Sequence, residues 1–232
     1  MSPAARSTPR SARSTSRPAP AAARLAPRRR AVSEAEKSKR RASIVSAAKK
    51  VFARRGFHGT TMADVAKAAR LSYGSVYWYF DSKDSLFHAL MDEEEQALRG
   101  AIAAAIAADI AAAGDDDPER LLRAAVRATF EFFEADRAAV TLLFRDSYAL
   151  GSRFEKHLFG LYERFIDDLE GLIADGSQRQ VIIDVPPKMA AFSVAALVAQ
   201  LALRRLSADD GLSAPAAADF VVDLVFEGLR PR

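Results

Sequence analysis

The sequence contains no cysteine. Disulfides, thiolate metal sites and cysteine nucleophiles are therefore excluded, and nothing indicates an oxidising compartment. Long apolar runs are also missing, because the longest alanine-rich stretch, Ala101 to Ala113, is broken by Asp109 and falls short of the roughly 18 to 20 residues needed to span a bilayer. We therefore expect a cytoplasmic protein without a membrane partner.

Signals of catalysis are absent as well. The three histidines at positions 58, 88 and 157 are scattered, and no phosphate-binding glycine loop or nucleophile elbow is present. The acidic run Asp115 to Asp117 indicates a solvated turn rather than a metal site. We therefore expect a protein that is not an enzyme and that has no catalytic residues, no metal and no cofactor.

The first 32 residues contain no acidic residue. They contain eight arginines and no acid, whereas residues 33–100 hold 12 basic and 9 acidic residues and residues 101–232 hold 14 basic and 21 acidic residues. The basic front half suits a polyanion and the acidic back half does not. The first 32 residues are also rich in Ser, Pro and Ala, which predicts disorder. Both an arm that grips DNA and a solvated tail without a specific role remain open.

Proline is absent between Pro27 and Pro118, which permits long helices there. Apolar periodicity, caps and breakers predict an all-α chain. The only strand-like run, Val181 to Val185, is too short to build a sheet. The expected helices cover about 36–55, 62–69, 73–79, 83–112, 118–135, 137–148, 152–175, 187–206 and 214–229.

The most informative stretch is residues 61–80. Its first apolar positions repeat at helical spacing and predict one buried face: Met62, Val65, Ala66 and Ala69. Thr61 and Asp64 have the spacing of a capping box, and Ser72 can cap the helix that follows. That second helix is short and nearly free of acid, so it fits a DNA major groove with its first residues nearest the base edges.

Residues 38–91 resemble the N-terminal domain of the TetR/AcrR family of bacterial transcriptional regulators. The resemblance rests on three segments that follow one another in the family's order, residues 44–57, 60–69 and 72–86, and it covers about a quarter of the chain. It implies an all-α protein with an N-terminal three-helix helix-turn-helix DNA-binding domain and a C-terminal helical ligand-binding and dimerisation domain. The corresponding boundaries are a disordered basic arm at 1–35 and the two domains at 36–92 and 93–232.

The resemblance also implies which residues contact DNA. Thr61, Tyr77 and Lys83 match phosphate-contacting positions, and the first turn of the second short helix matches the part that reads base edges. Arg70 stands where the family usually has glycine, so either the turn differs or a left-handed backbone strain of about 1 kcal/mol is tolerated. Trp78 either faces DNA or packs against the first helix. The expected DNA contacts are Thr61, Arg70, Ser72, Tyr73, Gly74, Ser75, Tyr77, Trp78 and Lys83.

The C-terminal region is rich in phenylalanine at helical spacing. Such stripes either pack as core or line a cavity, and the resemblance implies an effector pocket. An apolar pocket with a single Arg or His would suit a small amphipathic acid, such as a fatty acid or its thioester. The expected pocket residues are Phe130, Phe133, Thr141, Phe144, Arg145, Tyr148, His157 and Tyr162.

The last two expected helices, 187–206 and 214–229, are apolar on broad faces, which either indicates a partner or means that both faces pack inside the chain. The resemblance implies a homodimer through these helices. We therefore predict a sequence-specific DNA-binding transcriptional regulator, a repressor that binds a palindromic operator as a homodimer and is released by a small hydrophobic or amphipathic effector. The alternative is a helical lipid- or small-molecule-binding protein that does not bind DNA. Salt-dependent binding to a palindrome separates the two.

Overall fold

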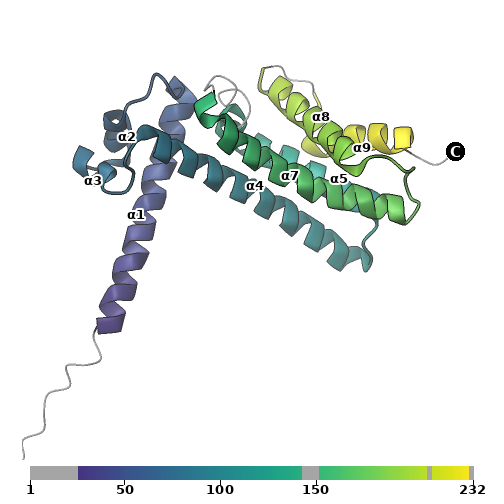
Figure 1. Ribbon diagram of the computed structural model, residues 1–232, viewed down its shortest axis with the longest axis horizontal. Helices are drawn as coiled ribbons and strands as arrows, with labels where there is room; N and C mark the ends of the chain where they lie inside the picture. Colours follow the sequence, from purple (N-terminus) through teal and green to yellow (C-terminus); the bar gives the residue numbers. More distant parts are fainter. Residues whose placement is uncertain (1–25, 143–151, 208–210, 230–232) are drawn as a thin grey trace, which may run out of the picture. The chain divides into compact units, whose positions relative to one another are not determined.

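Figure 1 shows the computed structural model of the 232-residue chain, which describes the backbone of residues 26–142, 152–207 and 211–229. Within these ranges, the side chains of residues 26–33, 152–155, 157, 158, 161, 206, 207 and 229 also lie outside the description. Every regular element in the described ranges is a helix, which confirms the all-α prediction. The helices are α1 (Ala26–Arg55), α2 (Met62–Ala69), α3 (Tyr73–Tyr77), α4 (Lys83–Ala113), α5 (Pro118–Ala135), α6 (Arg137–Val140), α7 (Ser152–Gln178), α8 (Pro187–Ser207) and α9 (Ala214–Leu229).

The chain divides into two compact units, residues 1–40 and 41–232. In the first unit α1 begins at Ala26, ten residues before the expected start, so residues 26–35 are helical and were wrongly assigned to the disordered arm. Pro27 is compatible with this start because the first turn of a helix needs no backbone donor there. The rest of the expected arm, residues 1–25, lies outside the described residues.

Two other helix ends differ from the sequence prediction by three residues or more. Helix α7 runs past Gly176 to Gln178, and the left-handed residue that follows is Gln180, with φ of 58°. Gly176 is useful inside the helix instead, since a Cβ there would stand 3.4 Å from a carbon of Ile182, which folds back and is buried. Helix α6 was expected to reach residue 148. It covers Arg137–Val140, Thr141 and Leu142 continue it with a wider turn, and residues 143–151 lie outside the description.

One hydrophobic core joins α1, α2, α3 and the first turns of α4. Its centre is a group of three phenylalanines, Phe52, Phe57 and Phe87, whose ring centroids lie 5.2 to 5.8 Å apart. Edge-to-face rings at this separation stabilise one another beyond their buried area. This core fixes the directions in which α2 and α3 present their outer faces.

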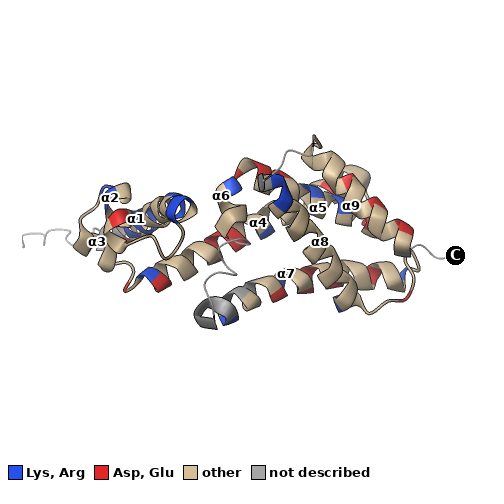
Figure 2. Ribbon diagram, turned by 90° about the horizontal axis from the view of Figure 1, so that it is seen from above, with Lys and Arg blue, Asp and Glu red and all other residues tan. Residues whose placement is uncertain are grey.

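A second core joins α5, α7, α8 and α9. Phe130 and Phe133 of α5 are almost fully buried in it, together with Ile166 of α7 and Val221 and Val222 of α9. Outside this core, Arg123 of α5 bridges Asp219 and Asp223 of α9 at 2.9 and 2.8 Å. These ion pairs account for part of the interleaved blue and red colouring of α5 and α9 in Figure 2.

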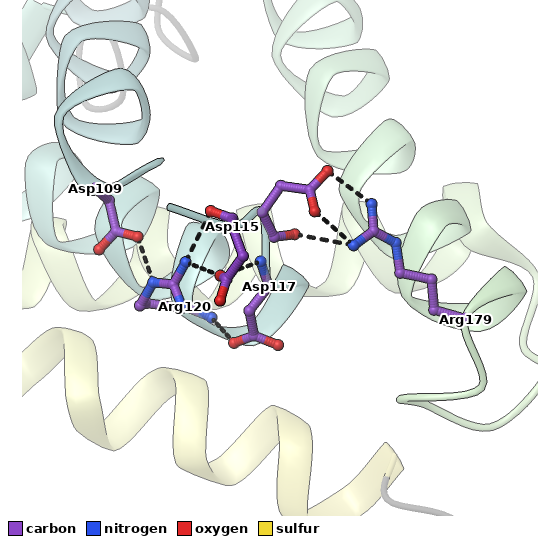
Figure 3. A network of polar contacts seen from close by, with 6 residues as sticks. Asp109, Asp115, Asp117, Arg120 and Arg179 are labelled. Atoms are coloured by element: carbon purple, nitrogen blue, oxygen red, sulfur yellow. Dashed lines mark hydrogen bonds and ion pairs between the residues drawn. The ribbon is translucent and has the colours of Figure 1, made fainter. Parts of the chain in front are cut away.

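The acidic turn between α4 and α5 is organised by arginines (Figure 3). Arg120 binds the carboxylates of Asp109 and Asp115, and Asp117 caps α5 by accepting a hydrogen bond from the Arg120 backbone N–H at 3.0 Å. Arg179 at the end of α7 holds both carboxylate oxygens of Asp116 at 2.7 and 2.8 Å. These contacts make the acidic run a pinned turn. In the part of the chain that the structure describes, no group of three His or acidic side chains is arranged to hold a metal.

The expectation that no segment is long and apolar enough to span a bilayer is wrong for α4. Among the described helices, it alone is long and apolar enough to cross a membrane, with a mean hydropathy of 1.3 over an 18-residue window. Isolated charges such as Asp109 interrupt the alanine run without making the helix polar. A single helix that passes such a test is weak evidence for a membrane, because core helices of other proteins pass it too.

Candidate DNA interface and effector cavity

The start of α2 is fixed by the predicted capping box. The Thr61 hydroxyl oxygen accepts from the Asp64 backbone N–H at 3.2 Å, and the Asp64 carboxylate accepts from the Thr61 backbone N–H at 3.0 Å. The carboxylate also accepts from the Thr61 hydroxyl at 2.7 Å and from Arg55 at 2.7 Å. The hydrogen bonds from Thr61 hold the pKa of Asp64 below its usual value. Aspartate thus performs the capping role that glutamate or glutamine usually has.

The turn after α2 keeps the geometry that a glycine would give. Arg70 adopts a left-handed backbone with φ of 57° and ψ of 39°, and its N–H donates to the carbonyls that end the helix. The Leu71 N–H donates back to the Ala66 carbonyl at 2.9 Å, as in a Schellman-type helix end. Of the two alternatives for this turn, the structure has the tolerated strain and places the arginine side chain in solvent.

Helix α3 is anchored on one side and exposed on the other. Ser72 caps it by accepting from the Ser75 N–H at 3.2 Å, and Val76 is fully buried beneath it. The opposite face carries Tyr73 and Tyr77, whose rings lie 4.7 Å apart and whose hydroxyl groups are joined at 3.1 Å. Tyr73 is 55% exposed and Tyr77 is 37% exposed. The short helix therefore presents a pair of phenolic hydroxyl groups.

Trp78 lies at the end of the same helix and is 65% exposed. Its ring meets Tyr79 edge to face at 4.7 Å. The side chain therefore lies largely in solvent, and its contact with DNA stays a prediction. Gly74 faces open space, since a Cβ added there would meet no atom within 4 Å. Packing inside the protein therefore does not require glycine at this position, and the close approach of DNA to its backbone stays a prediction.

Lys83 does something that the sequence did not indicate. Its ammonium group donates to the carbonyls of Phe57 and Thr60, both at 2.8 Å, and lies 4.3 Å from the centre of the Phe57 ring. The side chain therefore fastens the start of α4 to the loop that precedes α2. Its contact with DNA phosphate stays a prediction.

A cavity of about 470 Å³ lies among α4, α5, α7 and α8. Among the residues that the structure describes, its lining is almost entirely apolar, and the charged ones are Arg99 of α4 and Asp168 of α7. Thr129, also in the lining, donates its hydroxyl hydrogen to the Ala125 carbonyl at 2.8 Å. The apolar lining includes Ile102, Ile106, Val126, Phe165, Leu172 and Val198.

Of the residues expected to line an effector pocket, the four whose side chains the structure describes are not among the described lining of this cavity. Phe130 and Phe133 fill core space, Thr141 donates to the Arg137 carbonyl at 3.1 Å, and Tyr162 packs edge to face on Phe192. Phe144, Arg145, Tyr148 and the side chain of His157 lie outside the described residues. The cavity sits where side chains are small, at Gly100, Ala103 and Ala125, which sequence reasoning that followed aromatic residues did not single out.

Comparison with known proteins identifies the chain. Residues 44–90 match the model of bacterial regulatory proteins of the tetR family, and residues 114–229 match the tetracyclin repressor-like C-terminal domain. The chain belongs to the TetR family. It is a transcriptional regulator with a DNA-binding domain, and relatives of this kind are named as regulators rather than enzymes.

Among curated relatives, the transcriptional regulator TtgR of Pseudomonas putida is 42% identical over 64 residues, which are 28% of this chain and 30% of TtgR. The match to this relative thus spans about a third of its length. Two solved structures share the fold along most of both chains. FadR of Bacillus subtilis, in complex with stearoyl-CoA, has a TM-score of 0.71 at 17% identity and covers 81% of this chain and 98% of its own. AibR, in complex with isovaleryl coenzyme A and operator DNA, has a TM-score of 0.66 at 22% identity, with the same coverage.

Proposed function

We propose that this TetR-family regulator is a homodimeric repressor that grips a palindromic operator with two copies of α3 and is released by a small amphipathic effector. The observation that carries the DNA part is the exposed face of α3. The helix packs on the protein core through Val76, whereas Tyr73, Tyr77 and Trp78 on its outer face are exposed and available to another molecule. A short capped helix of this kind fits the major groove, and its hydroxyl groups can bind phosphate.

Positive charge near α3 supports the same reading. Residues 41–55 of α1, which belong to the same compact unit as α3, contain five lysines and arginines and no acid, and Lys67 and Arg70 are exposed at the end of α2. Basic side chains release counterions from DNA when they bind phosphate, which makes affinity depend steeply on salt. We assign Thr61, Arg70, Ser72 and Lys83 to backbone contacts, and the first turn of α3, with Tyr73, Gly74 and Ser75, to base contacts.

The homodimer is supported by the outer faces of α8 and α9. Helix α9 buries Val221 and Val222, yet Phe220 and Leu224, one turn apart on another face, are each 55% exposed. On α8, Met189 and Phe192 are exposed as well. Large apolar side chains gathered in this way are typical of an interface with another molecule. A second copy of the same chain also explains why the operator would be a palindrome, because dimer symmetry dictates half-sites one helical turn or a multiple of it apart.

Effector release is supported by the position of the cavity. One continuous helix, α4, lines the cavity with Ile102 and Ile106 and binds the loop before α2 through Lys83. The neighbouring folds that hold acyl-CoA molecules make a similar effector class reasonable for this chain. The effector releases DNA only if it binds the conformation that does not fit the operator more tightly than the one that does.

The test begins with footprinting of the DNA upstream of the chain's own gene. A fluorescent duplex from the protected region is then titrated with protein over a range of KCl concentrations. We expect a palindromic footprint, an affinity that falls steeply with salt, and two chains per duplex. Binding that is indifferent to salt, or no protected region, would overturn the DNA part and leave the helical small-molecule-binding protein as the alternative.

The dimer is tested separately with Leu224→Glu and with Ile110→Glu as the matched control. Both residues are exposed and apolar, but Ile110 lies at the end of α4, away from the proposed interface. Burying an unpaired charge in an apolar contact is costly, so the Leu224 variant should sediment as a monomer and bind DNA weakly, while the control stays a dimer. Dimers in both variants would place the interface elsewhere.

A further inference from the structure

The cavity among α4, α5, α7 and α8 has a charged mouth. Arg99 and Asp168 are part of the lining, yet their side chains are 40% and 52% exposed, so they lie where the cavity meets solvent. Behind them the lining is apolar. A site with an apolar interior and an ion pair at its entrance suits a ligand that has a tail and one charged end.

The ion pair itself has the geometry of carboxylate recognition. The Arg99 Nε donates to one Asp168 carboxylate oxygen at 2.8 Å and Nη2 donates to the other at 3.1 Å. These two parallel bonds are the fork by which a guanidinium group binds any carboxylate. The hydrogen bonds to Asp168 raise the pKa of Arg99, and an arginine side chain is in any case charged at neutral pH.

A second acid keeps Arg99 in place. Glu95, one turn before Arg99, is buried and lies 3.6 Å from the Arg99 guanidinium. Its carboxylate also accepts from Arg164 Nε at 3.1 Å. Glu95 therefore holds Arg99 at the cavity mouth whether or not Asp168 is bound to it.

We propose that Arg99 is the residue that recognises the effector's anionic end, and that the effector's carboxylate takes the place of Asp168 on the guanidinium fork. The proposal rests on the proposed function only in taking this cavity as the effector site. An ion pair as exposed as Arg99–Asp168 contributes little to stability, so exchanging its acid costs little. Burial of the effector's tail in the apolar interior then favours the exchange.

The exchange has a structural consequence. Asp168 belongs to α7 and Arg99 to α4, so the pair ties the two helices together beside the cavity. Once the effector's carboxylate occupies the fork, Asp168 is repelled by it and the tie is cut. The ligand thereby acts on α4, which also holds the loop before α2.

The volume sets the size of the tail. An engineered cavity of about 150 Å³ accommodates benzene, so the cavity here has room for an apolar group roughly three times as large. The nine methyl and methylene carbons of decanoate fit within that limit. Decan-1-ol has the same length without the charge, and acetate has the charge without the tail.

The experiment is calorimetric titration of the full chain, without DNA, with each of these three compounds. For the wild type we expect decanoate to bind about tenfold or more tightly than decan-1-ol, because its charge-assisted bidentate contact with Arg99 replaces only a weak, exposed ion pair. Acetate should show no measurable binding. Equal affinities for decanoate and decan-1-ol, or no binding of decanoate, would overturn the proposal.

Two substitutions should act in opposite directions. Arg99→Gln should remove the preference for decanoate over decan-1-ol. Asp168→Asn removes the competing acid and should tighten decanoate binding by about two- to fivefold, the equivalent of an exposed ion pair. Arg164→Gln is the matched control, because Arg164 binds the same Glu95 without lining the cavity, and it should behave as the wild type. If Arg99–Asp168 only supported the fold, both substitutions would weaken binding, which would overturn the proposal.

The same variants separate this inference from the proposed function. Binding of decanoate is measured without DNA, and release is measured afterwards by adding decanoate to the protein on its duplex. Decanoate that binds through Arg99 but leaves DNA affinity unchanged would refute ligand release and preserve the recognition role of Arg99. DNA binding that persists while decanoate fails to bind would refute the recognition role alone.

Discussion

Substitutions at Arg70 can measure both the backbone strain at this position and the contribution of its side chain to DNA binding. It holds a left-handed backbone, with φ of 57°, at the end of α2, where it donates its N–H to helix-ending carbonyls. Its side chain is exposed beside the proposed DNA-binding face. Two substitutions divide these roles. Arg70→Ala removes the guanidinium and keeps the strain, while Arg70→Gly removes both.

The size of the effect follows from the conformation. A left-handed backbone costs a residue with a Cβ about 1–2 kcal/mol, whereas glycine gives up about 0.5–1 kcal/mol because it is freer in the unfolded chain. The glycine variant should therefore have a free energy of unfolding about 0.5–1 kcal/mol above that of the alanine variant. In a protein of this size, that difference corresponds to a rise of about 1–4 °C in Tm.

The assay combines thermal unfolding with DNA titration. The difference in Tm between the glycine and alanine variants reports strain, because neither has the arginine side chain. Both variants should lose about one unit of the slope of log affinity against log salt if the guanidinium binds a phosphate. An alanine variant at least as stable as the glycine variant would refute the strain argument, and an unchanged slope would remove Arg70 from the interface.

Three further predictions concern the same domain. Tyr77→Phe should weaken DNA binding about three- to tenfold on all duplexes, because one hydrogen bond to phosphate is lost. Fluorescence anisotropy of a labelled duplex measures this affinity, and an unchanged affinity would mean that the Tyr77 hydroxyl does not contact DNA. Lys83→Ala should lower the free energy of unfolding in urea by about 2–4 kcal/mol, since two carbonyls lose a charged donor, and full stability would contradict that role. The lowered pKa of Asp64 means that its stabilisation is present above its usual value of 3.8 and is lost as pH falls through the lowered pKa. Asp64→Asn should therefore be less stable than the wild type at pH 7 and equal to it in strong acid, and a difference that persists in acid would contradict this account.

The local structure of α2 and α3 could be predicted because short-range chemistry determines it. The capping box joins residues three apart, Ser72 caps its own helix, and the apolar face of α2 repeats at helical spacing. The left-handed turn at Arg70 was harder, because arginine does not signal that conformation as glycine does. The structure shows the conformation directly, in the φ of 57° at Arg70 and in the hydrogen bond from the Leu71 N–H to the Ala66 carbonyl.

The cavity could not be predicted from its lining, because a cavity forms where large side chains are missing. Phe130 and Phe133 were predicted to line the pocket, but they are buried in the hydrophobic core. The available signal was the cluster of small residues, Gly100 and Ala103 on α4 and Ala125 on α5. Even so, sequence spacing within each helix does not say which small residues face one another across two helices.

The same limit explains why the links between the two functional parts were missed. Lys49 of α1 forms ion pairs with Glu94 of α4 and with Asp136, which caps α6 by accepting from the backbone N–H groups of Ala138 and Ala139. Desolvation raises the pKa of Glu94, and the nearby Lys49 opposes that shift. Each of these pairs joins residues at least 45 positions apart, which no local pattern reveals.

Leu142, just after α6, supplies a second link. It is fully buried in the core formed by α1, α2, α3 and the start of α4. The segment 136–142 therefore contacts the DNA-binding domain at both ends, by an ion pair at Asp136 and by apolar packing at Leu142.

Helix α4 supplies a connection of its own, since Lys83 and Ile102 are 19 positions apart on one helix, or about 28 Å. A tilt of about 5° at the cavity would displace the far end of such a helix by about 2.5 Å, enough to break hydrogen bonds of the length that Lys83 makes. A ligand that shifts α4 therefore has a direct mechanical route to the turn that holds α2 and α3.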